Sequence, residues 1–204
     1  MLKIPKLCDC DSIPSSLPGL TDKVWEQQLA AKQILISGPI NEDLIEKAVM
    51  QIFNFNLIDA QTEAESRSYE RQPILVFLNS PGGHIDEAFS LISAMLSSET
   101  PVHTIALGKA HSAAFMILLA GQKRFAQRFS TMMFHQGAGG VVDNFAQIQD
   151  YSNYILKIQD KVENFVIERT KIKEKKLKEV FVRQHNWYMD AEEALSLGVI
   201  HGVL

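Results

Sequence analysis

The sequence predicts an α/β fold in which strand–turn–helix units repeat along the chain. Runs rich in apolar and β-branched residues at 33–37, 74–78 and 102–107 each end in a turn that contains glycine or proline, and segments with helical spacing follow them. The run at 74–78 is continuous and does not alternate with polar residues. Such a run is typical of a strand covered on both faces, as in a parallel sheet between helices.

Length and composition limit the classes of protein to which the chain can belong. A chain of 204 residues is long enough for one domain with a sizeable core. The net charge of −4 argues against a nucleic-acid partner, and the longest apolar run, 113–120, is shorter than a membrane span. The cysteines, Cys8 and Cys10, lack nearby histidines and make a poor zinc site, so we expect no metal and a reducing, cytoplasmic location.

The first part of the chain divides into an arm and the start of a domain. Residues 1–21 contain three prolines and no periodicity, which indicates a flexible N-terminal arm before a single domain at 22–204. Helices are expected at 21–32 and 41–52. Residues 59–72 are polar and offer little apolar surface to bury, which predicts a solvated connection or insertion.

The second part continues the alternation of strands and helices. The expected elements are a helix at 85–97, a buried helix from Ser112, a short strand at 132–135, a long helix at 143–171, a short helix from 190 and a strand at 198–200. The long helix exceeds what a small core needs, so its far end is expected to project. The basic run at 171–179 is interpreted as a solvated face.

Residues that can carry chemistry follow three of the predicted strands. Ser112 lies between the end of a strand and the first turn of an apolar helix, where the helix dipole favours an oxyanion and hence a nucleophile. The alternative is that Ser112 only caps the helix. Among the six histidines, His135 alone follows a buried strand and precedes a glycine-rich loop, as a general base for Ser112 requires. Gly82-Gly83 either supplies oxyanion-binding N–H groups or forms a simple tight turn.

Four separated motifs carry a family resemblance. They are Asn79-Ser80-Pro81-Gly82-Gly83, Gly108-Lys109-Ala110-His111-Ser112-Ala113, Met133-Phe134-His135-Gln136, and Asp190-Ala191-Glu192-Glu193-Ala194 with Gly198-Val199-Ile200. Their order and approximate spacing resemble those of the proteolytic subunit of the Clp protease, from about Val24 to the C-terminus. The resemblance implies a crotonase-like fold of repeated βαβ units with a projecting handle helix.

The resemblance also implies a set of site residues. Ser112 is the expected nucleophile, His135 the general base and Asn186 the third member of the triad. The backbone N–H groups of Gly83 and Ala113 are the expected oxyanion donors. Substrate is expected to bind along His84, Ile85, Gly137, Ala138 and Gly139. The chemistry implied needs no metal or cofactor, since ATP would be used only by a partner unfoldase.

The chain departs from the family pattern near the expected triad. Asn186 stands where the family has an aspartate, and His185 stands where the family has an arginine used between rings. An amide can hold the histidine tautomer, but it cannot stabilise an imidazolium as a carboxylate does. In a serine protease, aspartate to asparagine can cost about 10⁴ in turnover.

The leading hypothesis is a serine endopeptidase that hydrolyses unfolded proteins inside an oligomeric chamber. The family implies self-association into rings, as a heptamer or tetradecamer, and an AAA+ unfoldase as partner. The alternative is a weakly active or inactive structural or regulatory ring subunit that assembles with an active paralogue. Two further hypotheses are acyl-CoA chemistry on the same fold and a phage-encoded capsid-maturation protease.

Overall fold

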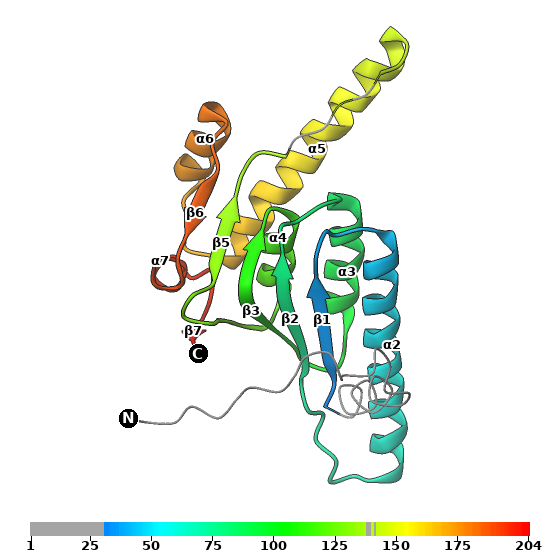
Figure 1. The fold of residues 1–204 in the computed structure, drawn as a ribbon. Coiled ribbons are helices and arrows are strands. Elements are labelled where there is room, and N and C mark those ends of the chain that lie inside the picture. The colour runs from blue at the N-terminus through cyan, green and yellow to red at the C-terminus, as the bar shows by residue number, and fades with distance from the viewer. Residues whose placement is uncertain (1–30, 138–139, 141) are drawn as a thin grey trace, which may run out of the picture. The chain divides into compact units, whose positions relative to one another are not determined.

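The structure is a computed structural model that describes residues 31–137, 140 and 142–204 (Figure 1). The predicted arm at 1–21 and nearly all of the predicted helix at 21–32 lie outside the described residues. The elements are β1 (Gln33–Ser37), α2 (Glu42–Glu65), β2 (Ile74–Ser80), α3 (Ile85–Ser97), β3 (Val102–His111), α4 (Ala113–Ala120), β4 (Lys123–Ala126), β5 (Thr131–Phe134), α5 (Phe145–Arg169), α6 (Glu174–Arg183), β6 (Trp187–Met189), α7 (Ala191–Ser196) and β7 (Gly202–Val203).

A seven-stranded sheet organises the described chain. Strands β1, β2, β3, β4 and β7 lie side by side in that order and are all parallel. Strand β3 is long enough to have two neighbours on one side, because residues 103–106 pair with β4 and residues 109–111 pair with β5. Strand β6 extends the sheet by pairing antiparallel with β5. The predicted α/β fold of repeated strand–helix units is confirmed.

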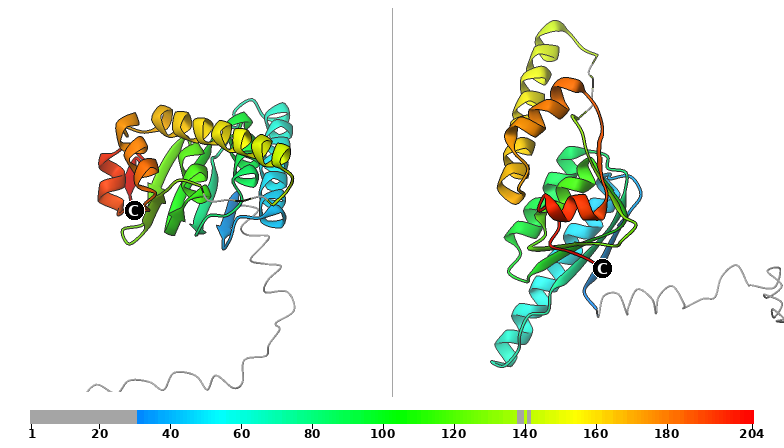
Figure 2. Two further views of the ribbon diagram at one scale, coloured as in Figure 1. Left: turned by 90° about the horizontal axis from the view of Figure 1, so that it is seen from above. Right: turned by 90° about the vertical axis from the view of Figure 1, so that its left-hand side faces the viewer.

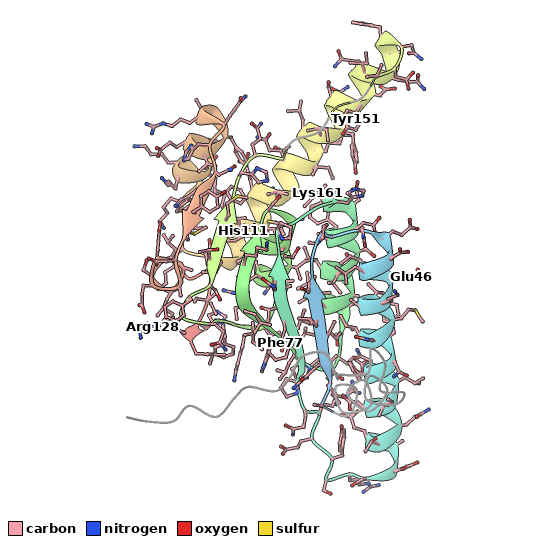
Figure 3. The ribbon with its side chains drawn as sticks, viewed as in Figure 1. Glu46, Phe77, His111, Arg128, Tyr151 and Lys161 are labelled. Carbon is pink, nitrogen blue, oxygen red and sulfur yellow. The ribbon has the colours of Figure 1, made fainter. Side chains whose placement is uncertain are left out.

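The two faces of the sheet are covered unequally. Figure 2 shows α2, α3 and α4 on the same face. In β2, Ile74, Val76 and Leu78 are fully buried, whereas Leu75 and Phe77 on the other face are only half-buried (Figure 3). The expectation that 74–78 is covered on both faces is therefore met on one face only among the described residues, since the other face is half-buried. The apolar run of β2 is continuous because its second face, with Leu75 and Phe77, is also apolar although it is only half-buried.

The segment at 59–72, expected to be solvated, begins with one buried carboxylate. Helix α2 continues to Glu65, and the Asp59 carboxylate on its inner side is fully buried. That carboxylate pairs with Lys32 Nζ and accepts hydrogen bonds from Tyr69 Oη at 2.6 Å and Thr100 Oγ1 at 2.5 Å. The expected solvated segment is correct for most of 59–72, whose residues are mainly exposed, and wrong for Asp59, because a buried charge is stable when partners such as these surround it.

Helix α5 begins beyond the sheet and ends against it. Its second half contributes the buried Ile158 and Val166, whereas its first half projects (Figure 1) and exposes Phe145 and Leu156. The long projecting helix predicted from the sequence is confirmed, but the expectation that its far end projects is wrong, because the far half carries the buried residues that pack against the rest of the fold. The end of α5 is fixed by buried Arg124, whose guanidinium donates to the Arg169 carbonyl at 2.8 Å and to the carbonyls that precede β7.

Three short elements and one boundary differ from the predictions. Strands β4 and β6 and helix α6 have no counterpart among the predicted elements. Helix α6 carries most of the basic run, and it buries Leu177, Val180 and Phe181 while its lysines remain mostly exposed, in agreement with a solvated face. The terminal strand lies at Gly202–Val203, after the predicted range 198–200, because residues 198–199 accept the Arg124 hydrogen bonds.

Candidate active site

Ser112 occupies the junction between β3 and α4 in a strained backbone conformation. Its φ of 56° and ψ of −122° are unusual for a residue with a side chain, and such conformations cost about 1–3 kcal/mol. A hydrogen bond from the Ser112 N–H to the Met133 carbonyl, at 2.8 Å, helps to hold it. The Ser112 hydroxyl makes no capping bond to α4. Ser112 thus occupies the N-cap position of α4 without side-chain capping, and it lines a cleft.

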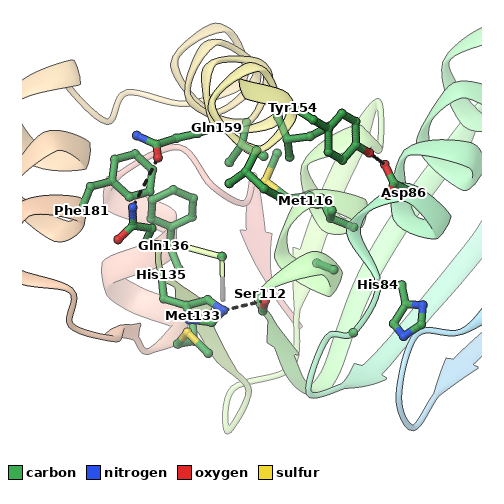
Figure 4. Close-up of a pocket in the computed structure, with 18 of the residues that line it drawn as sticks. His84, Asp86, Ser112, Met116, Met133, His135, Gln136, Tyr154, Gln159 and Phe181 are labelled. Carbon is green, nitrogen blue, oxygen red and sulfur yellow. Dashed lines mark hydrogen bonds between the residues drawn. The ribbon is translucent and has the colours of Figure 1, made fainter. Parts of the chain in front are cut away.

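His135 supplies a base within reach of this hydroxyl. Its Nε2 lies 2.7 Å from Ser112 Oγ, which is hydrogen-bonding distance (Figure 4). Strand pairing explains the contact, because His111 and Met133 are partners in the β3–β5 register and each precedes its site residue by one or two positions. Burial lowers the pKa of His135 below its ordinary value of 6.5. Around neutral pH the imidazole is therefore in the uncharged form that can accept a proton.

The glycine turn after β2 packs directly against Ser112. Gly82 has a φ of 95°, and a Cβ there would lie 2.7 Å from both the His111 carbonyl oxygen and Ser112 Cβ. Hydrogen bonds from Ile40 to Gly82 and from His84 to Ile40 fix the turn. Within the described chain, the N–H groups of Gly83 and Ala113 donate to no other protein atom. The turn and the first residue of α4 thus offer two free donors beside the nucleophile candidate.

Asn186 is not joined to His135 by a hydrogen bond in the structure. Its side chain is exposed, and its Nδ2 donates to Tyr188 Oη at 3.4 Å. The β5–β6 register pairs Phe134 with Trp187, so extending it by one residue places His135 opposite Asn186. Directly opposed residues on antiparallel strands have Cβ atoms about 4.5–5.5 Å apart. The backbone therefore places Asn186 beside His135, while its side chain points toward Tyr188.

A cleft of about 550 Å³ opens in front of the Ser112 hydroxyl. It lies between the turn after β2, the start of α4, the end of β5 and the inner side of α5 (Figure 4). The sequence-predicted residues that line it are Gly83, His84, Ile85, Ser112, Ala113, His135 and Gly137. Ala138 and Gly139 lie outside the described residues. The volume is in the range of ordinary ligand-binding clefts.

The apolar wall of the cleft was not identified from the sequence. Met116 of α4, Phe134 of β5, Ile155 and Ile158 of α5 and Phe181 of α6 line it together with the predicted residues. Four elements far apart in the chain therefore meet at this wall. The sequence signal for the α5 residues is a helical apolar stripe, which also describes an ordinary core face.

Comparison with known proteins identifies the family. A profile of the Clp protease family matches residues 19–204. The chain belongs to the Clp protease family. It is 30% identical over 183 residues to the ATP-dependent Clp protease proteolytic subunit 2 of Bacillus licheniformis, covering 89% of this chain and 90% of that protein.

Two further relatives show the same level of similarity to this Clp family member. The ATP-dependent Clp protease proteolytic subunit 2 of Treponema denticola is 29% identical, covering 88% of this chain and 84% of that protein. Subunit 1 of the same protease in Bacillus cereus is 29% identical, covering 89% of each chain. The sequence-based resemblance to the family is confirmed, and the chain is a ClpP-like subunit.

Two further findings concern only the residues that the structure describes. These residues contain no group of three or more histidine, cysteine, aspartate or glutamate side chains placed to hold a metal ion. None of their helices combines the length and apolar character needed to cross a bilayer.

Proposed function

We propose that this Clp family member is a serine endopeptidase that cleaves unfolded polypeptides. The observation that supports this most directly is the 2.7 Å contact between Ser112 Oγ and His135 Nε2, next to two free backbone N–H groups. A nucleophile, a neutral base and an oxyanion site in one cleft are the parts that acyl transfer requires.

The residues divide the chemistry as follows. Ser112 Oγ attacks the peptide carbonyl carbon while His135 Nε2 takes the hydroxyl proton. The N–H groups of Gly83 and Ala113 donate to the carbonyl oxygen as it becomes an oxyanion. His135 then gives its proton to the departing amine as the C–N bond breaks and leaves an acyl ester on Ser112. Water, deprotonated by His135, hydrolyses the ester and restores the hydroxyl. These steps need no metal or cofactor.

Asn186 completes the proposed triad after a rotation of its side chain. The strand register already sets its backbone opposite His135. A change of side-chain rotamer brings the amide oxygen toward the imidazole Nδ1–H, where it orients the ring and selects the tautomer with a free Nε2. This contact is absent in the described arrangement, in which the Asn186 amide donates to Tyr188.

The proposal includes the assembly in which Clp family members work. Rings of this chain, as a heptamer or a pair of heptamers, would enclose the cleft, and an AAA+ unfoldase would feed substrate and use ATP. The exposed apolar residues on the projecting part of α5, Phe145, Ile148 and Leu156, support a contact between subunits. We place the protein in the cytoplasm because its cysteines, Cys8 and Cys10, make a poor disulfide or zinc pair.

One observation favours a second candidate function. An exposed amide at Asn186, facing Tyr188, leaves His135 without a charged partner. A subunit with a weakened triad would serve as a structural or regulatory member of a ring that contains an active paralogue. Both candidates use the same fold and differ in the reactivity of Ser112.

Labelling with a fluorophosphonate probe separates the two candidates. We expect the purified protein to be labelled and to hydrolyse a short fluorogenic peptide, and Ser112→Ala to lose both properties while it keeps its circular dichroism spectrum. The exposed Ser90 provides the matched control, since Ser90→Ala should change neither. Turnover that persists in Ser112→Ala excludes the proposed nucleophile. A ring, sized in the same buffer, that is neither labelled nor active supports the structural subunit.

A further inference from the structure

The described lining of the cleft in front of Ser112 contains one acidic residue and neither lysine nor arginine. Among the described residues that line it, Asp86 is the only aspartate, glutamate, lysine or arginine. Asp86 lies in the first turn of α3, three residues after the proposed oxyanion donor Gly83. The rest of the lining is apolar or aromatic, with two histidines and two glutamines. Asp86 is therefore the only carboxylate in a cleft whose described lining is mostly apolar or aromatic.

Helix α5 contributes two tyrosines to the same cleft, and one of them binds this carboxylate. Tyr154 Oη donates to Asp86 Oδ1 at 2.5 Å, so the bond spans from α5 to α3. Hydrogen bonding to Asp86 raises the pKa of Tyr154, which keeps this phenol protonated and donating. The Tyr151 ring lies 6.3 Å from the Tyr154 ring, centroid to centroid (Figure 3 shows Tyr151 on α5). Asp86 Oδ2 makes no hydrogen bond to any described residue.

The apolar wall leads from the nucleophile candidate to this acidic end. In the view of Figure 4, the Ser112–His135 pair and the Tyr154–Asp86 pair lie on either side of Met116. Met116 and Ile155 both line the same cleft. A long side chain that enters beside Ser112 would therefore pack against Met116 and Ile155. Its end would then reach the Asp86 carboxylate and the tyrosine rings of α5.

We propose that this end of the cleft binds a lysine or arginine side chain of the polypeptide substrate. The aliphatic stem packs along Met116 and Ile155, as the stems of long cationic residues do on apolar surfaces. The cationic head binds the free oxygen of Asp86 and lies against the rings of Tyr151 and Tyr154, which attract cations through their faces. The inference rests on the proposed function, because it names a specificity determinant of the same cleft.

Charge and exposure set the expected size of the preference. An acidic substrate side chain would meet Asp86 with no cation in the lining to offset it. A neutral apolar side chain fills the wall and leaves the carboxylate unpaired. Asp86 is exposed, and ion pairs at exposed sites are weak, so the preference for a cation over an isosteric neutral chain should be about three- to tenfold.

The test compares two peptides that differ only in one charge. Fluorescent peptides carrying lysine or norleucine at one position are titrated against the Ser112→Ala protein, and binding is followed by anisotropy, so turnover plays no part. We expect the lysine peptide to bind about three- to tenfold more tightly. Asp86→Asn in the same background should abolish this difference. Glu87→Gln removes a charge one residue away and should preserve it.

Separate outcomes bear on the subsite and on the proposed function. Equal affinity of the two peptides, no binding of either, or a lysine preference that survives Asp86→Asn overturns the cation subsite. Tyr154→Phe keeps the aromatic ring and leaves Asp86 in place, so this variant should still prefer the lysine peptide. Loss of the preference in Tyr154→Phe overturns the role given to Asp86. Fluorophosphonate labelling of Ser112 is measured in parallel on the wild-type protein. If the lysine preference is absent but Ser112 is labelled, the subsite is overturned and the peptidase proposal is supported. If the lysine preference depends on Asp86 but Ser112 is not labelled, the subsite is supported and the peptidase proposal is overturned.

Discussion

The buried Asp59 cluster allows a sharp prediction about stability. Asp59→Asn keeps the size of the side chain but removes its charge. The carboxylate now pairs with Lys32 and accepts from Tyr69 and Thr100. An asparagine can still accept from a hydroxyl, but its NH₂ group must face the Lys32 ammonium or another donor. The variant therefore loses the ion pair and leaves a nearly buried lysine, 12% exposed, without its counter-ion.

The magnitude follows from burial. Breaking a buried ion pair by removing one partner costs about 3–5 kcal/mol, and Lys32 keeps some access to water, so we expect about 3 kcal/mol of lost unfolding free energy. For a chain of this size, each kcal/mol lowers the melting temperature by about 2–4 °C. Asp59→Asn should therefore melt about 6–12 °C below the wild-type protein.

Circular dichroism melts at one fixed protein concentration provide the measurement. Glu63→Gln is the matched control, because Glu63 pairs with Arg71 at the exposed edge of the same region and the variant should change the melting temperature much less.

The pH dependence of stability gives a second check. Burial alone would raise the pKa of Asp59, but hydrogen bonds from Lys32, Thr100 and Tyr69 outweigh it and lower the pKa below 3.8. The stability that Asp59 contributes is present above pH 3.8 and is lost as the pH falls through the lowered pKa. Equal melting temperatures for the two variants would refute the reasoning.

The remaining predictions concern the candidate site. Because burial lowers the pKa of His135 and only the neutral ring accepts a proton, kcat/KM should fall on the acid side at a pH below 6.5, as a pH–rate profile would show. Asn186→Asp should raise kcat and move that acid limb to higher pH, because a nearby carboxylate favours the imidazolium. Gly82→Ala should reduce peptide hydrolysis at least tenfold with the fold retained, because its Cβ would displace the Ser112 backbone; Ser90→Ala, at an exposed residue outside the cleft lining, is the control.

Each of these has an outcome that contradicts it. An acid limb above pH 6.5 in the wild-type protein would oppose the neutral, desolvated base. An unchanged profile in Asn186→Asp would mean that position 186 does not contact the imidazole during turnover. Full activity in Gly82→Ala would show that the turn can move away from Ser112 without consequence.

Much of the fold was predictable because its strands and long helices have clear periodicity. The apolar runs of β1, β2 and β3 and the stripe of α5 were identified from spacing alone. Helix α6 was missed because lysine and glutamate outnumber its three buried apolar residues. The Asp59 cluster was missed for a different reason: its partners Lys32 and Thr100 lie 27 and 41 residues away, and nothing local reveals that they meet.

The candidate site divides in the same way. Ser112 and His135 follow parallel strands, and the carboxyl ends of such strands meet at one edge of a sheet, so their proximity could be anticipated. The position of the Asn186 side chain could not, because the β5–β6 register fixes its backbone but leaves its rotamer to local contacts with Tyr188. Met116 and Ile155 were unremarkable in the sequence, since a cleft wall and a core face have the same pattern.

The pairing of β5 with β6 also constrains the order in which the site can form during synthesis. Strand β5, which leads into His135, has β3 on one side and β6 on the other. Residues 187–189 leave the ribosome only after α5 and α6 have been made. Until then the histidine strand is an unprotected sheet edge, and position 186 has no partner across from it. A nascent chain therefore carries its serine and histidine long before the arrangement around them is complete, so the cleft of a half-made subunit lacks its final shape.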